Sequence, residues 1–314
     1  MKACLVFGSG GLIGRAVVDT LEKTRFGRVI YTPKITWASE PTAQVEIGQV
    51  VHEWLAQSQC DRWELYWCAG AGGPRSGVDA NEQERRLYRT VLHQIEQAVK
   101  TNQAQQITIF FSSSAGGVYG STGQTIATEL SVPQPTDDYG KSKFELERVT
   151  TEFSQRTGIE SVIGRISSVY GEHQDLQKRL GLITHLAFSI AARKPISIFT
   201  NLATTRNYIA AATAGAMIVH HVQCTKESGS ILRNVCAPYD TSVAELLTLT
   251  KQVTGHPVEI AYSGAAEIDN SRISTNFADE ICHLTRTSLP AEFARLINYF
   301  RISVAQYGEL QIRP

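Results

Sequence analysis

The sequence predicts an α/β protein with a doubly wound parallel sheet and a smaller C-terminal lobe. Three observations support this fold class. Short apolar segments alternate with longer amphipathic ones, a glycine-rich turn follows the first apolar segment, and the alternation loosens after about residue 167. Strand, helix and strand in this order are typical of a parallel sheet that is covered by helices on both faces.

The expected strands are short, apolar segments at 3–8, 28–32, 64–69, 107–112 and 161–166. Helical spacing of apolar residues predicts helices at 12–23, 79–100 and 138–155, and the second half adds a helix near 179–193 and a strand at 196–200. Only about a dozen residues separate the second strand from the segment QVEIGQ, which is too few for a helix and two connections. We therefore expect a shortened crossover there.

Composition and charge exclude several classes of function. The chain has 314 residues, with 42% apolar and 19% charged side chains, which is typical of a globular protein. Its 30 basic and 30 acidic side chains cancel, so no general attraction to nucleic acid or to an anionic membrane is expected. A bound anion therefore needs a local site.

The cysteines and the apolar segments point to the cytoplasm. The 6 cysteines form no C-x-x-C pair, which argues against a zinc site or a disulfide framework. The first apolar segment runs into a glycine turn, where a signal peptide would continue. The longest nearly apolar stretch, at 209–219, is far shorter than the ~20 residues that cross a bilayer. We expect no metal and no membrane anchor.

The turn FGSGGLIGR follows the first strand and precedes an amphipathic helix. Glycines at this junction let the backbone approach a pyrophosphate, whose charge then meets the N–H groups at the start of the helix. The pattern favours dinucleotide binding over a purely structural tight turn. The expected cofactor-binding residues here are Gly8, Gly10, Gly11, Leu12, Ile13, Gly14 and Arg15.

The end of the second strand bears on the choice of dinucleotide. A carboxylate there would bind the ribose hydroxyls of NAD and repel the additional phosphate of NADP. The strand ends in Tyr31, Thr32, Pro33 and Lys34, without a carboxylate. This favours NADP over NAD, with Lys34 and Arg15 as phosphate partners, although either cation could simply be a solvated surface residue.

Tyr139 and Lys143 lie four residues apart in the segment DDYGKSKFELE. On a helix this spacing places the phenol and the ammonium group on one face, where both can act on one small molecule. Chance alone would produce about 0.35 such pairs in a chain of this composition. The pair therefore needs support from its surroundings.

Further motifs surround the pair, in an order typical of one family. FFSSSAGGVYG occupies 110–120, RISSVYG occupies 165–171 and TTRNYI occupies 204–209. With the glycine turn and YGKSK, these segments resemble the extended branch of the short-chain dehydrogenase/reductase superfamily. That branch contains NAD(P)-dependent nucleotide-sugar epimerases, dehydratases and 4-keto reductases. The resemblance covers nearly the full length and implies a Rossmann-type fold.

The resemblance implies roles for individual residues. Tyr139 would be the acid/base, and Lys143 would hold the nicotinamide ribose and lower the pKa of the phenol. A serine would stabilise charge on the reacting oxygen; counting from the strand favours Ser114, with Ser113 next, or the serines could merely satisfy backbone groups. Substrate contacts are expected from Arg206, Ser168 and Tyr119, although Arg206 could form an ion pair and Tyr119 could be a packing residue.

Some positions depart from the family pattern. Arg86 and Arg89 stand where a polar residue and a glycine are usual, and Asn207 stands where an acid is usual. These changes weaken the expected contacts with a sugar nucleotide. In contrast, the shortened crossover and the missing carboxylate resemble the NADPH-dependent 4-keto-sugar reductases.

Together these observations predict a dinucleotide-binding domain at 1–166 and a mainly substrate-binding lobe at 167–314, interleaved with the first. The expected function is an NADP(H)-dependent oxidoreductase or epimerase of a nucleotide-linked sugar in glycan biosynthesis, with a 4-keto sugar as one option for the substrate. The alternatives are a reductase of a non-nucleotide carbonyl compound and a non-catalytic NAD(P)-sensing protein. Because relatives often pair through two long helices, the resemblance also implies a homodimer. The balanced charge predicts no nucleic-acid partner.

Overall fold

The structure is a computed structural model that describes residues 1–24, 27–70, 77–101, 106–178, 181–224, 229–255, 259–262, 267–285 and 287–307, with the backbone alone at 100, 101 and 178. The chain divides into two compact units. The first comprises Met1–Gly120, Val132–Ile166 and Gly215–Val235, and the second comprises Ser121–Ser131, Ser167–Ala214 and Cys236–Pro314.

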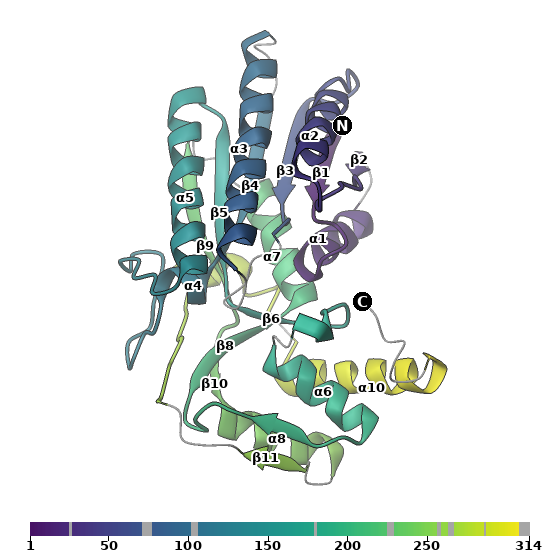
Figure 1. Cartoon of the computed structure of the whole chain (residues 1–314), viewed down its shortest axis with the longest axis vertical. Helices are drawn as coiled ribbons and strands as arrows, with labels where there is room; N and C mark the ends of the chain where they lie inside the picture. Colours follow the sequence, from purple (N-terminus) through teal and green to yellow (C-terminus); the bar gives the residue numbers. More distant parts are fainter. Residues whose placement is uncertain are drawn as a thin grey trace. The chain divides into compact units, whose positions relative to one another are not determined.

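The first unit is built on a six-stranded sheet in the order β2-β1-β3-β4-β5-β9 (Figure 1). Every neighbouring pair in this sheet is parallel, which confirms the predicted fold class. Because β2 and β3 flank β1, the carboxyl end of β1 is a point where the strand order reverses, and such points bind ligands in α/β proteins. The strands are β1 Lys2–Phe7, β2 Arg28–Tyr31, β3 Arg62–Trp67, β4 Gln106–Ser114, β5 Glu160–Ile166 and β9 Ser230–Val235.

Helices cover both faces of this sheet, as Figure 1 shows. One face packs against α2, α3 and α5 through a core that includes Trp54, Tyr88 and Phe153. On the other face α7 approaches α1 so closely that a Cβ on Gly215 would lie 2.4 Å from the Ala16 carbonyl oxygen. The helices are α1 Leu12–Lys23, α2 Glu40–Leu55, α3 Val78–Thr101, α4 Ala115–Tyr119, α5 Asp138–Thr157 and α7 Ala211–Cys224.

The crossover between β2 and β3 differs from the prediction. It contains α2, a helix of 16 residues, so the expected shortened crossover is wrong. The segment QVEIGQ is itself part of this helix, because Ala43, Ile47, Val51 and Trp54 recur at helical spacing and are buried against the sheet. The similarity to 4-keto-sugar reductases that was drawn from crossover length therefore carries no weight.

The second unit has two small sheets and its own core. Its three-stranded sheet pairs β8 antiparallel to β10 and parallel to β6, and β7 pairs with β11. Helices α6 and α10 pack together through Leu186, Phe293 and Phe300. The elements are β6 Ser168–Tyr170, a 3-10 helix Leu176–Lys178, α6 Leu182–Ala192, β7 Ile196–Ile198, β8 Thr205–Ala210, β10 Asp240–Ser242, α8 Val243–Thr254, β11 Ile260–Tyr262, α9 Ala278–Ile281 and α10 Leu289–Tyr307.

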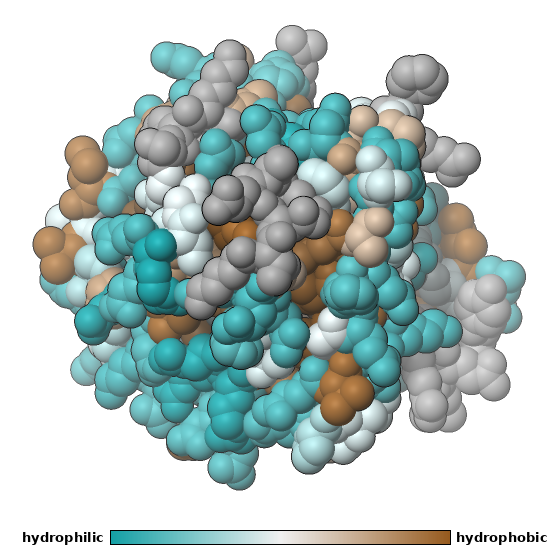
Figure 2. All heavy atoms as spheres, turned by 90° about the horizontal axis from the view of Figure 1, so that it is seen from above, coloured by the Kyte–Doolittle hydropathy of each residue, from teal (hydrophilic) through white to brown (hydrophobic). Residues whose placement is uncertain are grey.

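The surface seen from above is mostly hydrophilic, with scattered hydrophobic areas (Figure 2). Large apolar side chains that are exposed include Val45, Leu130 and Phe199. Among the helices in the described ranges, none combines the length and apolar character that a bilayer span requires.

Candidate functional site

The glycine turn after β1 is shaped by two very close backbone contacts. Gly8 has a φ of 79°, and a Cβ on it would lie 2.6 Å from the backbone of Cys68. A Cβ on Gly14 would lie 2.1 Å from the Gly8 carbonyl oxygen. Both distances are too short for any side chain, so these two glycines are required for the turn to pack against β3 and α1.

The other two glycines of the turn have no such packing role. A Cβ on Gly10 would meet nothing within 4 Å, and one on Gly11 would make only an ordinary contact. Gly11 is the N-cap of α1, whose first intrahelical bond joins the Arg15 N–H to the Gly11 carbonyl. The N–H groups of Leu12 and Ile13 therefore have no acceptor within the helix. A bare backbone beside free N–H groups suits an anionic ligand.

A cavity of about 230 Å³ adjoins this turn. Its lining includes Gly8, Gly11, Trp37, Gly70 and Glu84. Because a bare backbone and an indole ring line the same space, the cavity fits part of a dinucleotide, with phosphate on the turn and an aromatic group beside Trp37. Sequence reasoning missed Trp37 and Glu84.

The two cations proposed as phosphate partners, Arg15 and Lys34, are both exposed. Neither pairs with a carboxylate of the residues that the structure describes. Lys34 follows β2 within the connection to α2, as the sequence analysis placed it.

Tyr139 lies in the first turn of α5, beside α4. A Cβ on Gly117 would lie 3.2 Å from the Tyr139 ring and 3.2 Å from the Ser114 hydroxyl oxygen, so both groups surround this glycine. A Cβ on Gly140 would lie 2.0 Å from the Gly117 carbonyl oxygen. The glycine that follows Tyr139 is therefore needed for α5 to approach α4. The Asp137 carboxylate caps α5 by accepting from the Gly140 N–H.

Lys143 lies one turn further along α5 and is held by two acceptors. Its Nζ donates to Glu84 Oε1 at 2.6 Å and to the Ser112 carbonyl at 3.1 Å. It also lies 5.8 Å from the centroid of the Tyr139 ring. Both partners of the ion pair are almost fully buried, with 7% of the lysine and 3% of the glutamate side chain exposed.

The charges around Tyr139 act in opposite directions. Burial, the largest effect, raises the pKa of the phenol. The Lys143 charge lowers this pKa, as expected, but the Glu84 carboxylate raises it again, and a hydrogen bond with the Ser114 hydroxyl lowers it. The net result is a phenol whose pKa lies above its ordinary value.

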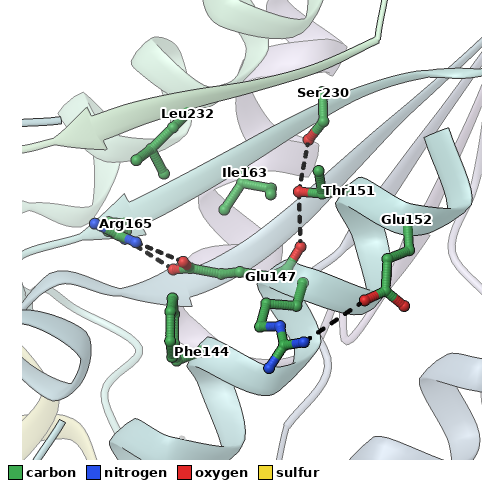
Figure 3. A pocket seen from close by; sticks show the side chains of 9 residues that line it. Phe144, Glu147, Thr151, Glu152, Ile163, Arg165, Ser230 and Leu232 are labelled. Atoms are coloured by element: carbon green, nitrogen blue, oxygen red, sulfur yellow. Dashed lines mark hydrogen bonds and ion pairs between the residues drawn. The ribbon is translucent and has the colours of Figure 1, made fainter. Parts of the chain in front are cut away.

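Ser113 is part of a different network. Its hydroxyl donates to Glu147 Oε1 at 2.6 Å, and Glu147 accepts two further bonds from Arg165, at 2.9 and 2.6 Å. Figure 3 shows this pair of ionised groups beside a hollow of about 330 Å³ next to α5, β5 and β9. Ser114 contacts Tyr139, whereas Ser113 anchors Glu147.

The expected substrate residues are placed as follows. The Tyr119 hydroxyl donates to Asn234 Oδ1 at 2.9 Å, and its ring lies 4.6 Å from the Arg165 guanidinium. Arg206 on β8 donates to Asp269 at 2.7 Å, while Ser168 begins β6 and is exposed. Tyr119 belongs to the first unit and the other two to the second.

The residues that depart from the family pattern have structural partners. Arg86 binds Glu40 of α2 at 2.8 Å, and Arg89 binds Glu145 of α5 at 2.9 Å. The Asn207 amide donates to three backbone carbonyls and to the Asp240 carboxylate. Each of these three side chains therefore ties two segments together.

A parallel sheet with a bare glycine turn at its switch point, next to a Ser–Tyr–Lys cluster, defines a Rossmann-type α/β protein. Residues 4–232 match the family model described as the NAD-dependent epimerase/dehydratase family. The chain belongs to this family, which confirms the resemblance to the extended short-chain dehydrogenase/reductases.

Individual relatives give further detail. A Methanocaldococcus jannaschii protein named "Putative UDP-glucose 4-epimerase" is 27% identical over 195 residues, which cover 62% of this chain and 63% of that protein. The dTDP-4-dehydro-6-deoxyglucose reductase of Escherichia coli is 33% identical over 101 residues, 32% of either chain. The match thus spans less than two thirds of each curated relative.

Among solved structures, the UDP-glucose 4-epimerase of Thermotoga maritima with UDP-glucose superimposes with a TM-score of 0.80. The alignment covers 97% of this chain and 100% of that one, at 18% identity. At this identity the similarity supports the fold.

The Glu147–Arg165 pair allows a test of the network around Ser113. We expect Glu147→Gln to lower the free energy of unfolding by about 3 kcal/mol, because it leaves the buried guanidinium without its counter-charge. Glu152→Gln is the matched control, since Glu152 is exposed and lies 3.9 Å from Arg148 on the same helix. It should change the free energy by less than ~0.5 kcal/mol. Urea unfolding measures both, and equal losses would contradict the role given to the buried pair.

Proposed function

We propose that the protein is an NADP(H)-dependent oxidoreductase of a nucleotide-linked sugar, most simply a reductase of a 4-keto group, with epimerisation as the related outcome. The observation that supports this most directly is the cluster of Tyr139, Ser114 and Lys143 in the same unit as the bare glycine turn. Family membership and the partial similarity to a 4-dehydro-sugar reductase agree with it.

The glycine turn would hold the diphosphate of the cofactor. Gly10 and Gly11 leave its outer side bare, and the N–H groups of Leu12 and Ile13 face the negative charge. Gly8 and Gly14 serve by holding the turn in shape. When bound, the reduced nicotinamide supplies the hydride that a carbonyl carbon accepts.

NADP is preferred in this proposal because β2 ends without a carboxylate. A carboxylate at that position would repel the 2′-phosphate, whereas the exposed ammonium group of Lys34 and the guanidinium of Arg15 would attract it. NAD remains the alternative, since NAD lacks only that phosphate.

The protein's part in the reaction is the transfer of a proton. Tyr139 gives its phenolic proton to the carbonyl oxygen while the carbonyl carbon takes up the hydride, which converts the ketone to an alcohol. The Ser114 hydroxyl, which already bonds to the Tyr139 phenol, would donate to the same oxygen and stabilise its developing charge. Lys143 would hold the ribose next to the nicotinamide.

Arg206, Ser168 and Tyr119 are the proposed substrate contacts. Arg206 is bound to the exposed Asp269 carboxylate and would have to exchange this partner for a phosphate. That requirement, with the Tyr119 hydroxyl already bonded, favours a non-nucleotide carbonyl compound as the second candidate substrate. A non-catalytic NAD(P) sensor is the less economical alternative, because it gives the Ser–Tyr–Lys cluster no task.

Replacing Tyr139 tests the role of the phenol. We expect Tyr139→Phe to reduce turnover by about 10² to 10⁴-fold, the range typical of a lost general acid, while cofactor binding stays nearly intact. Stopped-flow or steady-state absorbance of the reduced nicotinamide measures turnover, and calorimetry measures binding. Tyr262→Phe, at an exposed tyrosine of β11, is the control and should behave as the unmodified protein. Full activity of Tyr139→Phe would falsify the assignment.

Thermal stability in the presence of ligands tests the cofactor and the substrate class. At equal concentration NADP⁺ should raise Tm more than NAD⁺, because the ligand with the lower Kd stabilises the folded protein more. A ligand at 100 times its Kd adds about 2.7 kcal/mol to the free energy of unfolding. Lys34→Ala should remove most of the difference, whereas Lys23→Ala, at an exposed lysine of α1, should not. UDP or dTDP should give an additional shift.

Two outcomes of that experiment would count against the proposal. A larger shift with NAD⁺ than with NADP⁺ would reverse the cofactor preference. If neither UDP, dTDP nor another nucleoside diphosphate shifts Tm in the presence of cofactor, a non-nucleotide carbonyl substrate becomes the better explanation.

We also propose a homodimer through α3 and α5, on the basis of the resemblance. Several cations on these helices are already paired within one chain, for example Arg85 and Arg89 with Glu145. Light scattering after size-exclusion chromatography should give twice the 34.5 kDa of one chain. A single species of one chain's mass at micromolar concentration would exclude the dimer.

A further inference from the structure

The Glu84–Lys143 ion pair is the feature that the proposed function leaves unexplained, and the following inference rests on that function. Glu84 comes from α3 and Lys143 from α5, 59 residues apart in the chain. The lysine that the family pattern assigns to the cofactor ribose is bound instead by a carboxylate at 2.6 Å.

The surroundings of Glu84 connect it to the cofactor cavity. Glu84 is one of the residues that line the cavity adjoining Gly8 and Gly11. A Cβ on Gly70 would lie 3.0 to 3.2 Å from the Glu84 carboxylate, so the chain after β3 passes close to it with no side chain between. Glu84 is thus buried against Lys143 on one side and borders the proposed binding space on the other.

Stability alone does not account for this pair. Transferring two charges from water to a buried site costs several kcal/mol per ion, and an apolar pair of similar volume is often as stable or more so. Lys143 also bonds to the Ser112 carbonyl, so a neutral residue at 84 would still leave the ammonium one acceptor. Stability therefore gives no reason for a charged pair rather than an apolar pair at 84 and 143.

Tyr139 and Lys143 face each other on α5, and three further ionisable groups act on them. These are Glu84 on α3, Cys68 after β3, and Asp137 at the N-cap of α5. Burial raises the pKa of the Cys68 thiol to about 12, so this group is neutral at physiological pH. The charges that remain are one ammonium, the buried Glu84 carboxylate and the Asp137 carboxylate.

These charges oppose one another. Burial would lower the pKa of Lys143, but the adjacent Glu84 raises it overall, so the ammonium stays charged. Lys143 lowers the pKa of Tyr139, whereas Glu84 and then Asp137 raise it, in addition to burial. Glu84 therefore both keeps Lys143 charged and counteracts the effect of that charge on the phenol.

We infer that Glu84 is a positioning residue that holds Lys143 and counteracts the effect of the Lys143 charge on the Tyr139 phenol, so that the site is set to donate a proton rather than to accept one. A donor suits the reduction of a ketone, in which the oxygen must gain a proton as the carbon gains a hydride. The phenolate left on Tyr139 regains its proton from water. A site set for oxidation of an alcohol would need the phenolate at the start.

The test is a titration of the Tyr139 phenol in the protein without nucleotide. Ultraviolet difference spectra of each variant, minus those of the same variant carrying Tyr139→Phe, isolate this phenol from the other 10 of the 11 tyrosines. We expect Glu84→Gln to lower the titration midpoint by about one pH unit or more, because the Lys143 ammonium then faces the phenol without the Glu84 carboxylate beside it. The conservative Glu84→Asp should retain a midpoint near that of the unmodified protein.

Glu96→Gln is the matched control. Glu96 lies on α3 like Glu84, and it pairs with Arg156 of α5 at 2.9 Å. It is 12 positions further along, or about 18 Å at the rise of an α-helix. Its replacement removes the same charge between the same helices and should leave the midpoint unchanged.

A double variant keeps the test decisive if Glu84→Gln alone fails to fold. Glu84→Gln combined with Lys143→Met removes both charges and leaves no unpaired ion. Because the two charges act on the phenol in opposite directions, the midpoint should lie below that of Lys143→Met alone. A midpoint in the double variant equal to that of Lys143→Met alone would show that Glu84 does not act on the phenol and would overturn the inference, as would a Glu84→Gln midpoint equal to that of Glu96→Gln.

These outcomes are separable from failure of the proposed function. The titration uses no nucleotide, so it decides the role of Glu84 even if no nucleotide shifts Tm. If turnover is measurable, the upper limb of its pH profile should move down in Glu84→Gln by the same amount as the midpoint. An unchanged limb with a moved midpoint would contradict the link between Glu84 and catalysis while leaving the electrostatic result intact.

Discussion

The contact between Gly117 of α4 and Gly140 of α5 determines the geometry of the candidate site. A methyl group at 140 would lie 2.0 Å from the Gly117 carbonyl oxygen, so α5 can reach α4 only because residue 140 has no side chain. This approach places the Tyr139 ring and the Ser114 hydroxyl around one glycine. The helix then carries Lys143 one turn further, to the Ser112 carbonyl. The proposed chemistry at this site would therefore depend on a backbone contact before it depends on any polar side chain.

Local patterns were sufficient for much of this arrangement. The helix predicted at 12–23 is Leu12–Lys23, and that predicted at 138–155 is Asp138–Thr157. Both follow a strand or a cap and have clear apolar spacing, so neighbours in sequence determine them. The same holds for the turn at Gly8, because a strand, a glycine turn and a helix can be read in one short segment. The proximity of Tyr139 and Lys143 followed from helix geometry alone.

Contacts between distant segments could not be predicted in this way. Glu84 lies on a helix with many charged residues, and nothing in its local sequence distinguishes it from Glu82, whose side chain is 45% exposed. Its ion pair with Lys143 depends on α3 and α5 lying side by side, which only the fold provides. The prediction of a shortened crossover after β2 was wrong for a related reason. Val45 and Ile47 alternate with polar residues as in a strand, but the buried residues Ile47, Val51 and Trp54 follow helical spacing.

Helix α5 shows how buried charge can serve function and fold together. Lys143 and Glu147 lie one turn apart and are both buried; the first pairs with Glu84 of α3 and the second with Arg165 of β5. The two pairs run in opposite sense, since α5 contributes the cation to one and the anion to the other. Sliding α5 by one turn would bring Glu147 to Glu84, two carboxylates that repel, so the pairs favour a single register. A helix fixed in this way holds Tyr139 at a constant place relative to Ser114, which is the precision that the proposed proton transfer over one hydrogen bond would require.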